Sequence, residues 1–197
     1  MKKAYIIHGW GGHPDEHWMP WLQRELENNG FKVSVPQMPD TNKPKIKAWV
    51  SKLAEVAGNP DGDTYFVGHS LGCKAILRYL ETLNENIKIG GVVFVAPWIK
   101  LDRKTAEEEK GESIRIAKSW QENPIDFKKA KMHSRKFFAI FSDDDPYVPL
   151  SQADLISKEL DADIAIEKEA GHFTANDGIT ELPVVLEELL KMAGQNV

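Results

Sequence analysis

Five consecutive residues, Gly68-His69-Ser70-Leu71-Gly72, have the types and spacing that allow a serine to act as a nucleophile. They follow the apolar run 64–67, which predicts a strand, and they precede the stretch 74–80, which predicts a helix. In a strand–turn–helix of this kind the serine hydroxyl projects outward, and the glycines allow strand and helix to pack closely. The pattern alone is also compatible with a tight turn that merely requires small residues. The chemical interpretation therefore depends on finding partners for Ser70.

A serine hydroxyl needs a general base, and the base needs an acidic side chain that orients it. An acidic loop, Asp143-Asp144-Asp145, follows the apolar run 136–141, and His172 follows the short apolar run 164–166. Only His172 among the six histidines lies after the acidic loop, which gives the chain order nucleophile, acid, base. We therefore predict His172 as the base and an aspartate of this loop as the acid. Asp145 is the first choice because the run Asp145-Pro146-Tyr147-Val148-Pro149 resembles the Asp-x-x-Val-Pro ending of this loop in a known hydrolase superfamily, and Asp144 is the alternative. An aspartate without this role would be a solvated turn residue.

Backbone N–H groups are expected to bind the oxyanion that forms when a serine attacks a carbonyl group. One donor is the N–H of Leu71, directly after the nucleophile, and the other is the N–H of Trp10, in a glycine-rich loop after the first predicted strand. We expect His8, Gly9 and Trp98 to line a substrate pocket, because they lie at or just after the ends of predicted strands, at the same edge of the sheet. The alternative role of the glycines in the first loop is simple turn flexibility.

Short apolar runs alternate with longer amphipathic stretches along the whole chain. Strands are predicted at 4–8, 31–35, 64–67, 92–95, 136–141 and 164–166. Helices are predicted at 14–29, 44–57, 70–83, 150–160 and 179–192. This alternation predicts an α/β fold: residues 1–197 form a single domain, a three-layer α/β/α sandwich with a mostly parallel sheet of about six strands. Ser70, Asp145 and His172 then follow carboxyl ends of strands, where open parallel sheets bind ligands.

The stretch 100–132 departs from this rhythm, because it is charged and its apolar residues are sparse. We favour a solvated helical connection. The alternative is a small lid over the site that uses Trp120, Ile125 and Phe127.

Composition excludes several classes of function. The net charge of −5 and the isoelectric point near 5.7 give no basic surface for nucleic acid. Cys73 is the only cysteine, so an intramolecular disulfide is impossible, and we expect its thiol to be a small buried hydrophobe. No apolar run is long enough for a membrane span or a signal peptide, so we expect a cytoplasmic protein without membrane contact. The chemistry requires no metal or cofactor, and the spacing of the N-terminal histidines is not typical of a zinc site.

Together these motifs resemble the α/β-hydrolase superfamily, and more narrowly the small serine hydrolases related to retinoblastoma-binding protein nine and to bacterial YdeN-like proteins. The resemblance runs from about residue 4 to about residue 190, and it includes the segments 17–22 and 37–40. It implies a compact fold without a large cap, with Ser70, Asp145 and His172 as a triad. It does not imply binding of the retinoblastoma protein, because the required Leu-x-Cys-x-Glu motif ends here in Ala75.

We therefore expect two-step acyl transfer on a small-molecule ester, thioester or activated amide, with carboxylesterase-like activity as the first choice. Two other classes remain open at this point. The same scaffold supports peptidase, aminopeptidase-like or lyase activity, and it also supports a binding protein without catalysis.

Overall fold

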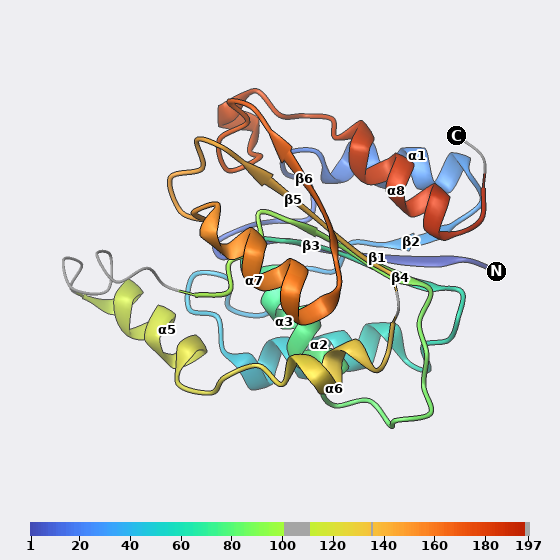
Figure 1. Ribbon diagram of the computed structural model, residues 1–197, viewed down its shortest axis with the longest axis horizontal. Coiled ribbons are helices and arrows are strands. Elements are labelled where there is room, and N and C mark those ends of the chain that lie inside the picture. Colours follow the sequence, from blue (N-terminus) through green and yellow to red (C-terminus); the bar gives the residue numbers. More distant parts are fainter. Residues whose placement is uncertain (101–110, 135, 196–197) are drawn as a thin grey trace.

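A computed structural model describes residues 1–100, 111–134 and 136–195 of the chain (Figure 1). Six strands form one sheet in the order β2-β1-β3-β4-β5-β6, and every neighbouring pair is parallel. The strands are β1 (Lys3–Ile7), β2 (Lys32–Ser34), β3 (Thr64–His69), β4 (Gly91–Val95), β5 (Phe137–Ser142) and β6 (Asp163–Glu167). The helices are α1 (Met19–Asn28), α2 (Ile46–Ala57), α3 (Leu71–Leu80), α5 (Glu112–Gln121), α6 (Phe127–Lys131), α7 (Ser151–Leu160), α8 (Pro183–Met192) and the short 3₁₀ helix η1 (Ala175–Asp177).

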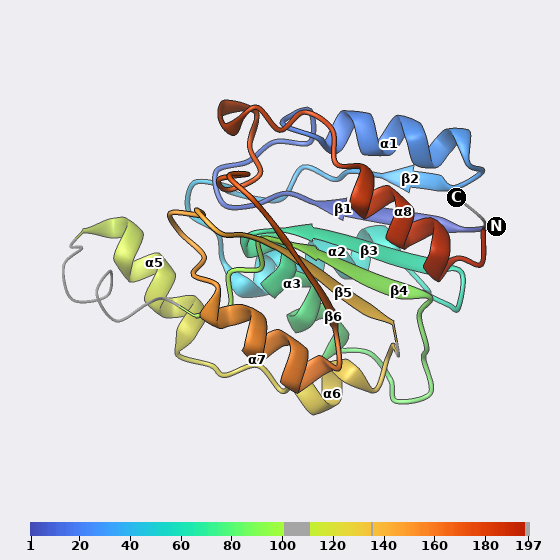
Figure 2. The ribbon, with the colours of Figure 1, turned by 45° about the horizontal axis from the view of Figure 1, so that its top comes forward.

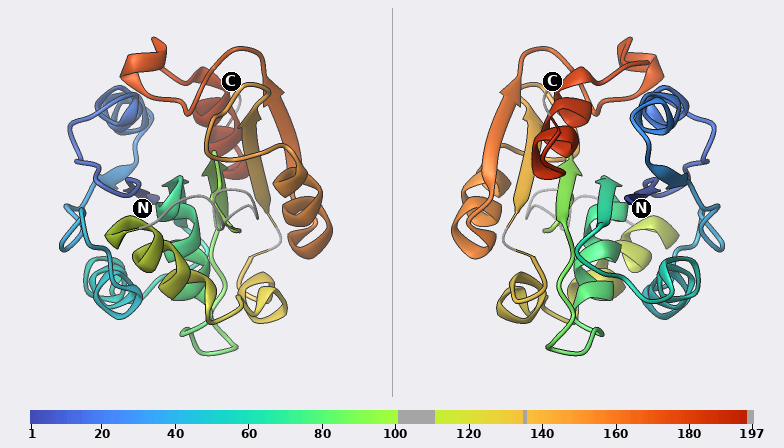
Figure 3. Two further views of the ribbon diagram at one scale, coloured as in Figure 1. Left: turned by 90° about the vertical axis from the view of Figure 1, so that its left-hand side faces the viewer. Right: turned by 90° about the vertical axis from the view of Figure 1, so that its right-hand side faces the viewer.

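The helices cover both faces of the sheet, which confirms the predicted three-layer α/β/α sandwich. Helices α1 and α8 lie on one face, and α2, α3, α6 and α7 lie on the other (Figures 1 and 3). The chain runs from β1 outward to β2 and then returns to the opposite side of β1 to form β3. The carboxyl ends of β1 and β3 are therefore adjacent where the winding direction changes, and open α/β sheets bind ligands at such a point.

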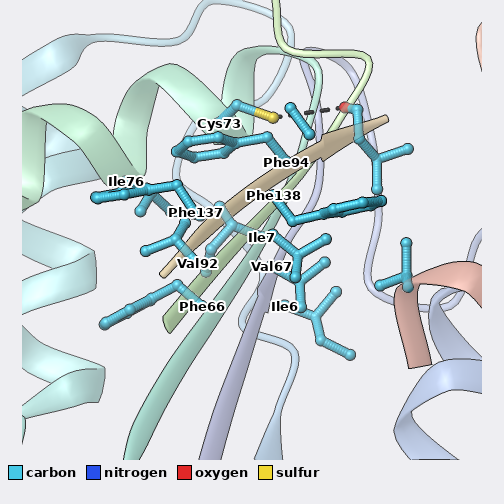
Figure 4. Close-up of a cluster of buried hydrophobic side chains, with 14 of the residues drawn as sticks. Ile6, Ile7, Phe66, Val67, Cys73, Ile76, Val92, Phe94, Phe137 and Phe138 are labelled. Carbon is cyan, nitrogen blue, oxygen red and sulfur yellow. Dashed lines mark hydrogen bonds between the residues drawn. The ribbon is translucent and has the colours of Figure 1, made fainter. Parts of the chain in front are cut away.

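The core lies between the sheet and its two helical layers. Strands β3, β4 and β5 are buried along their whole length, because helices cover both of their faces. Figure 4 shows part of this core, with Cys73 of α3 packed among aromatic and aliphatic side chains. The Cys73 thiol donates to the carbonyl oxygen of Val95 at 3.4 Å, and burial raises its pKa well above the ordinary value. Cys73 is thus the small buried hydrophobe that was expected.

The predicted helix 14–29 begins later than its pattern indicates, at Met19, with a proline in its first turn. Proline lacks a backbone N–H and suits only the first turn of a helix, so it marks the start here. The helix predicted at 179–192 is shortened to Pro183 in the same way. The residues before α1 form turns instead, and His17 among them has a positive φ of 58°.

The connection between β4 and β5 contains α5 and α6, while 101–110 of the predicted stretch 100–132 lie outside the described residues. Trp120 is fully buried, and its Nε1 donates to the carbonyl oxygen of Pro44 at 2.9 Å. Ile125 and Phe127 pack against the core. These three side chains anchor the connection to the domain, although α5 itself extends beyond the carboxyl edge of the sheet (Figure 2). Within the described residues, no helix has both the length and the apolar character needed to cross a bilayer.

Candidate active site

Ser70 occupies a strained turn between β3 and α3. Its φ of 53° and ψ of −117° are unusual for a residue with a side chain and persist only where the surrounding structure imposes them. A Cβ added at Gly68 would lie 2.7 Å from the backbone of Cys73, and one added at Gly72 would lie 2.3 Å from the carbonyl oxygen of Ile7. Both glycines are therefore required because α3 packs against the ends of β3 and β1. This packing holds Ser70 at the carboxyl edge of the sheet.

Asp145 and His172 meet across two loops. The Oδ2 of Asp145 lies 2.8 Å from the Nδ1 of His172, and its Oδ1 accepts the backbone N–H groups of Tyr147 at 2.8 Å and Val148 at 3.0 Å. The side chain of Asp145 is only 1% exposed and that of His172 is 12% exposed. A carboxylate oxygen can only accept here, so Nδ1 of His172 carries a proton and Nε2 of the neutral ring presents its lone pair.

The two other aspartates of the acidic loop have different partners. Asp144 Oδ1 accepts the hydroxyl of Ser142 at 2.6 Å and the N–H of Gly171 at 2.8 Å, and these hydrogen bonds hold the pKa of Asp144 below its usual range. Asp143 Oδ1 accepts the N–H of Glu169 at 2.9 Å. Both side chains are exposed, and they tie the acidic loop to the loop that carries His172.

The loop of His172 is held from two further sides. The backbone N–H of His172 donates to Oδ2 of Asp177 at 3.1 Å, and the same oxygen also accepts the N–H and the hydroxyl of Thr174. The backbone carbonyl oxygen of His172 accepts a hydrogen bond of 2.8 Å from Nε2 of His69, a residue of the serine turn. Burial lowers the pKa of His69 well below the ordinary value, and the nearby His172 lowers it further. His69 is thus a neutral donor that links the nucleophile turn to the base loop.

The predicted oxyanion donors lie on two backbone segments beside Ser70, because Leu71 follows it in the chain and Trp10 lines the same cavity. Within the described residues, neither the N–H of Trp10 nor that of Leu71 donates to a backbone oxygen. A Cβ added at Gly9 would lie 3.1 Å from Cβ of Ser70, so the glycine brings the first loop close to the nucleophile. The indole Nε1 of Trp10 donates to the carbonyl oxygen of Asn42 at 3.1 Å and fixes the other end of this loop.

A cavity of about 100 Å³ opens beside the nucleophile. It is lined by His8, Gly9, Trp10, Gly12, His17, Met19, His69, Ser70, His172 and Thr174. Of the three predicted pocket residues, His8 and Gly9 line this cavity, whereas Trp98 is not in its wall. The Trp98 ring lies 5.0 Å from the ammonium of Lys74, and the backbone N–H of Trp98 donates to the carbonyl oxygen of Ser70 at 3.4 Å. A pocket role for Trp98 therefore stays a prediction.

Four side chains of the cavity wall are not identified by sequence reasoning, namely His17, Met19, His69 and Thr174. His17 and Met19 belong to the segment 17–22 that carries part of the family resemblance, but a single sequence says nothing of their roles. Thr174 follows the predicted base by two positions, which is the one local signal that points to it. His69 contacts a residue 103 positions away, and no local pattern predicts such a contact.

The sequence model of the serine hydrolase family matches residues 4–191. The chain belongs to the serine hydrolase family. Among similar proteins, the hydrolase YdeN of Bacillus subtilis is 30% identical over 188 residues, which cover 95% of this chain and 94% of YdeN. The serine hydrolase RBBP9 of Rattus norvegicus is 27% identical over 194 residues, which cover 97% of each chain.

Solved structures agree with this membership. The crystal structure of the ydeN gene product of B. subtilis superposes with a TM-score of 0.87 at 29% identity, over 99% of this chain and 100% of the other. Est1E of Butyrivibrio proteoclasticus, with ferulic acid bound, has a TM-score of 0.78 at 15% identity, over 99% and 90% of the two chains. The second likeness shows the fold alone. The expected α/β-hydrolase relationship is thus confirmed.

Proposed function

We propose that this serine hydrolase cleaves small carboxylic esters through an acyl-enzyme intermediate, with Ser70 as nucleophile, His172 as base and Asp145 as acid. The observation that carries the proposal is the 2.8 Å contact of Asp145 with Nδ1 of His172. His172 and Ser70 line the same cavity. This contact leaves Nε2 of His172 as the proton acceptor that a serine hydroxyl needs.

The reaction follows from these positions. The Oγ of Ser70 attacks the ester carbonyl carbon as its proton passes to Nε2 of His172. The resulting oxyanion accepts the N–H groups of Trp10 and Leu71. The intermediate collapses, and the alcohol leaves with the proton from His172. Water then attacks the acyl-enzyme by the same route and releases the acid.

The choice of Asp145 over Asp144 has support from hydrogen bonding. Asp145 is nearly buried and directs one oxygen to His172, while two backbone N–H groups occupy the other oxygen. Asp144 is exposed, and its hydrogen-bonding oxygen is taken by Ser142 and Gly171. An acid that stabilises the cationic imidazole is most effective when it is shielded from water, which favours Asp145.

The size of the cavity supports a compact substrate. The cavity at Ser70 has a volume of about 100 Å³, and two residues with bulky side chains, Trp10 and Met19, are among those that line it. We therefore propose short acyl esters as substrates, with thioesters and activated amides as slower ones.

Replacement of the nucleophile tests the proposal directly. The Ser70→Ala variant should lose labelling by a fluorophosphonate probe and all hydrolysis of p-nitrophenyl acetate, because no other residue supplies the attacking oxygen. The exposed Ser51→Ala variant is the matched control and should retain both. Full labelling of Ser70→Ala would refute the nucleophile assignment. Labelling of the unaltered enzyme without turnover of any ester, thioester or aminoacyl amide would refute hydrolysis.

A further inference from the structure

Four histidines are among the residues that line the cavity beside Ser70, namely His8, His17, His69 and His172. The proposed mechanism uses only the last of them. The hydrogen bonds of the other three determine which ring nitrogen carries a proton and which proton is available to a substrate.

His8 and His69 have no ring proton to offer. The Nδ1 of His8 lies 2.9 Å from the carbonyl oxygen of Gly9 and so donates to it, while Nε2 accepts the N–H of Met38 at 3.0 Å. The Nε2 proton of His69 is donated to the carbonyl oxygen of His172. Both rings are buried, and burial lowers both pKa values, so each ring is neutral with its single proton engaged.

His17 differs from these two rings. Its Nδ1 accepts the N–H of Ala175 at 3.0 Å, so the proton of the neutral ring resides on Nε2. Burial lowers the pKa of His17, Glu16 opposes this effect, and the nearby His172 reinforces it. The ring is therefore neutral at pH 7.

The Nε2 proton of His17 has no acceptor among the described residues. The nearest carboxylate oxygen, Oε2 of Glu16, is 3.9 Å from Nε2, beyond hydrogen-bonding distance. The side chain is 21% exposed, so water can reach it before a substrate enters. A substrate that displaced this water without accepting the N–H would leave a buried donor unsatisfied, at a cost in binding.

We propose that Nε2–H of His17 binds an acceptor oxygen of the substrate, and that the preferred substrates are compact esters with a second oxygen a few bonds from the scissile carbonyl. The inference rests on the proposed function and names its substrate class. It makes His17 a specificity residue, separate from the residues that move protons in the reaction.

Two variants separate this role from a structural one. His17→Asn places an amide oxygen where Nδ1 accepts from Ala175, and asparagine tolerates the positive φ of this position, but it has no donor at the Nε2 position. His17→Gln extends an amide N–H to the Nε2 position. The first variant preserves the local structure without the cavity donor, and the second restores a donor.

The substrates are two pairs in which one ether oxygen replaces a methylene group. On the acyl side, p-nitrophenyl methoxyacetate is compared with p-nitrophenyl butyrate. On the alcohol side, 2-methoxyethyl acetate is compared with butyl acetate. The kcat/KM ratio within each pair is measured for each enzyme, and comparison between enzymes cancels the intrinsic reactivity of the esters.

In at least one pair, the His17→Asn substitution should lower the preference for the oxygen-containing ester roughly fivefold to tenfold, the effect of one neutral hydrogen bond. His17→Gln should recover part of it. In His17→Asn, turnover of the all-carbon esters should not fall, because the donor that they leave unsatisfied is gone, and thermal stability should change little. Ratios that are the same in all three enzymes would refute the inference and leave the proposed function intact. Absence of turnover of all four esters by the unaltered enzyme would refute both.

Discussion

The hydrogen bonds of Asp145 make the outcome of a one-atom change predictable. In the Asp145→Asn variant, the amide oxygen remains with the N–H groups of Tyr147 and Val148, because the opposite orientation would direct the NH₂ group at two donors. The NH₂ group then occupies the position of Oδ2, 2.8 Å from Nδ1 of His172. That nitrogen must become an acceptor, so the ring proton moves to Nε2. The base is then protonated where it should receive the proton of Ser70.

The size of the expected fall in kcat has two sources: the variant loses the correct tautomer of His172, and it loses the negative charge that stabilises the cationic ring. A change of this kind in a Ser-His-Asp triad lowers kcat about 10⁴-fold, equivalent to about 5 kcal/mol of transition-state stabilisation. The fold should persist, because two hydrogen bonds of the side chain are retained and the third, to Nδ1 of His172, is only reversed in direction.

The assay is kcat for p-nitrophenyl acetate, with circular dichroism as the check on folding, and Asp144→Asn is the matched control. Its amide oxygen can still accept from Ser142 and Gly171, so its kcat should fall less than about tenfold. A large loss in Asp144→Asn together with near-normal turnover in Asp145→Asn would refute the reasoning and assign the acid to Asp144.

Two further changes test the packing around the site. Lys74 is buried with its ammonium on the carbonyl oxygen of Ile99, and burial lowers its pKa to about 7. In the unfolded chain the same ammonium keeps its proton up to about pH 10.5. The free energy of unfolding should therefore rise by on the order of 3 kcal/mol between pH 7 and pH 10. Urea unfolding measures this rise, which should be smaller in the Lys74→Met variant. Gly72→Ala should lower the free energy of unfolding by about 1–3 kcal/mol and remove most of the activity, since the added Cβ would lie 2.3 Å from a backbone oxygen of β1. The control Gly62→Ala has nothing within 4 Å of the added Cβ and should leave stability and activity unchanged.

The sequence predicts the sheet well, because each strand is a short apolar run bounded by polar or glycine-containing turns. All six predicted strands are present, with ends that shift by one or two residues. The helices α2, α3 and α7 also begin and end close to the predicted positions. The first and last helices begin late, because the pattern gives no weight to the prolines that mark their first turns.

The site is predictable only in part. The positions of Ser70 and His172 follow from short motifs and from chain order, since Ser70 directly follows β3 and His172 lies in the loop after β6. The choice between Asp144 and Asp145 depends on which carboxylate faces the histidine. The loop conformation decides this, and chain order does not reveal it. The roles of His17 and His69 depend on contacts with residues more than one hundred positions away, at Ala175 and His172.

The link from His69 to His172 also has a consequence for how the enzyme acquires activity during folding. The contact joins residues 103 positions apart, from β3 near the middle of the sheet and from the loop after β6 at its edge. Closure of so long a loop carries a large entropic cost, so contacts of this separation form late relative to local helices. Helix content can therefore recover in refolding chains that are still inactive. Turnover then reports completion of the whole sheet, down to its last strand, rather than formation of the serine turn alone.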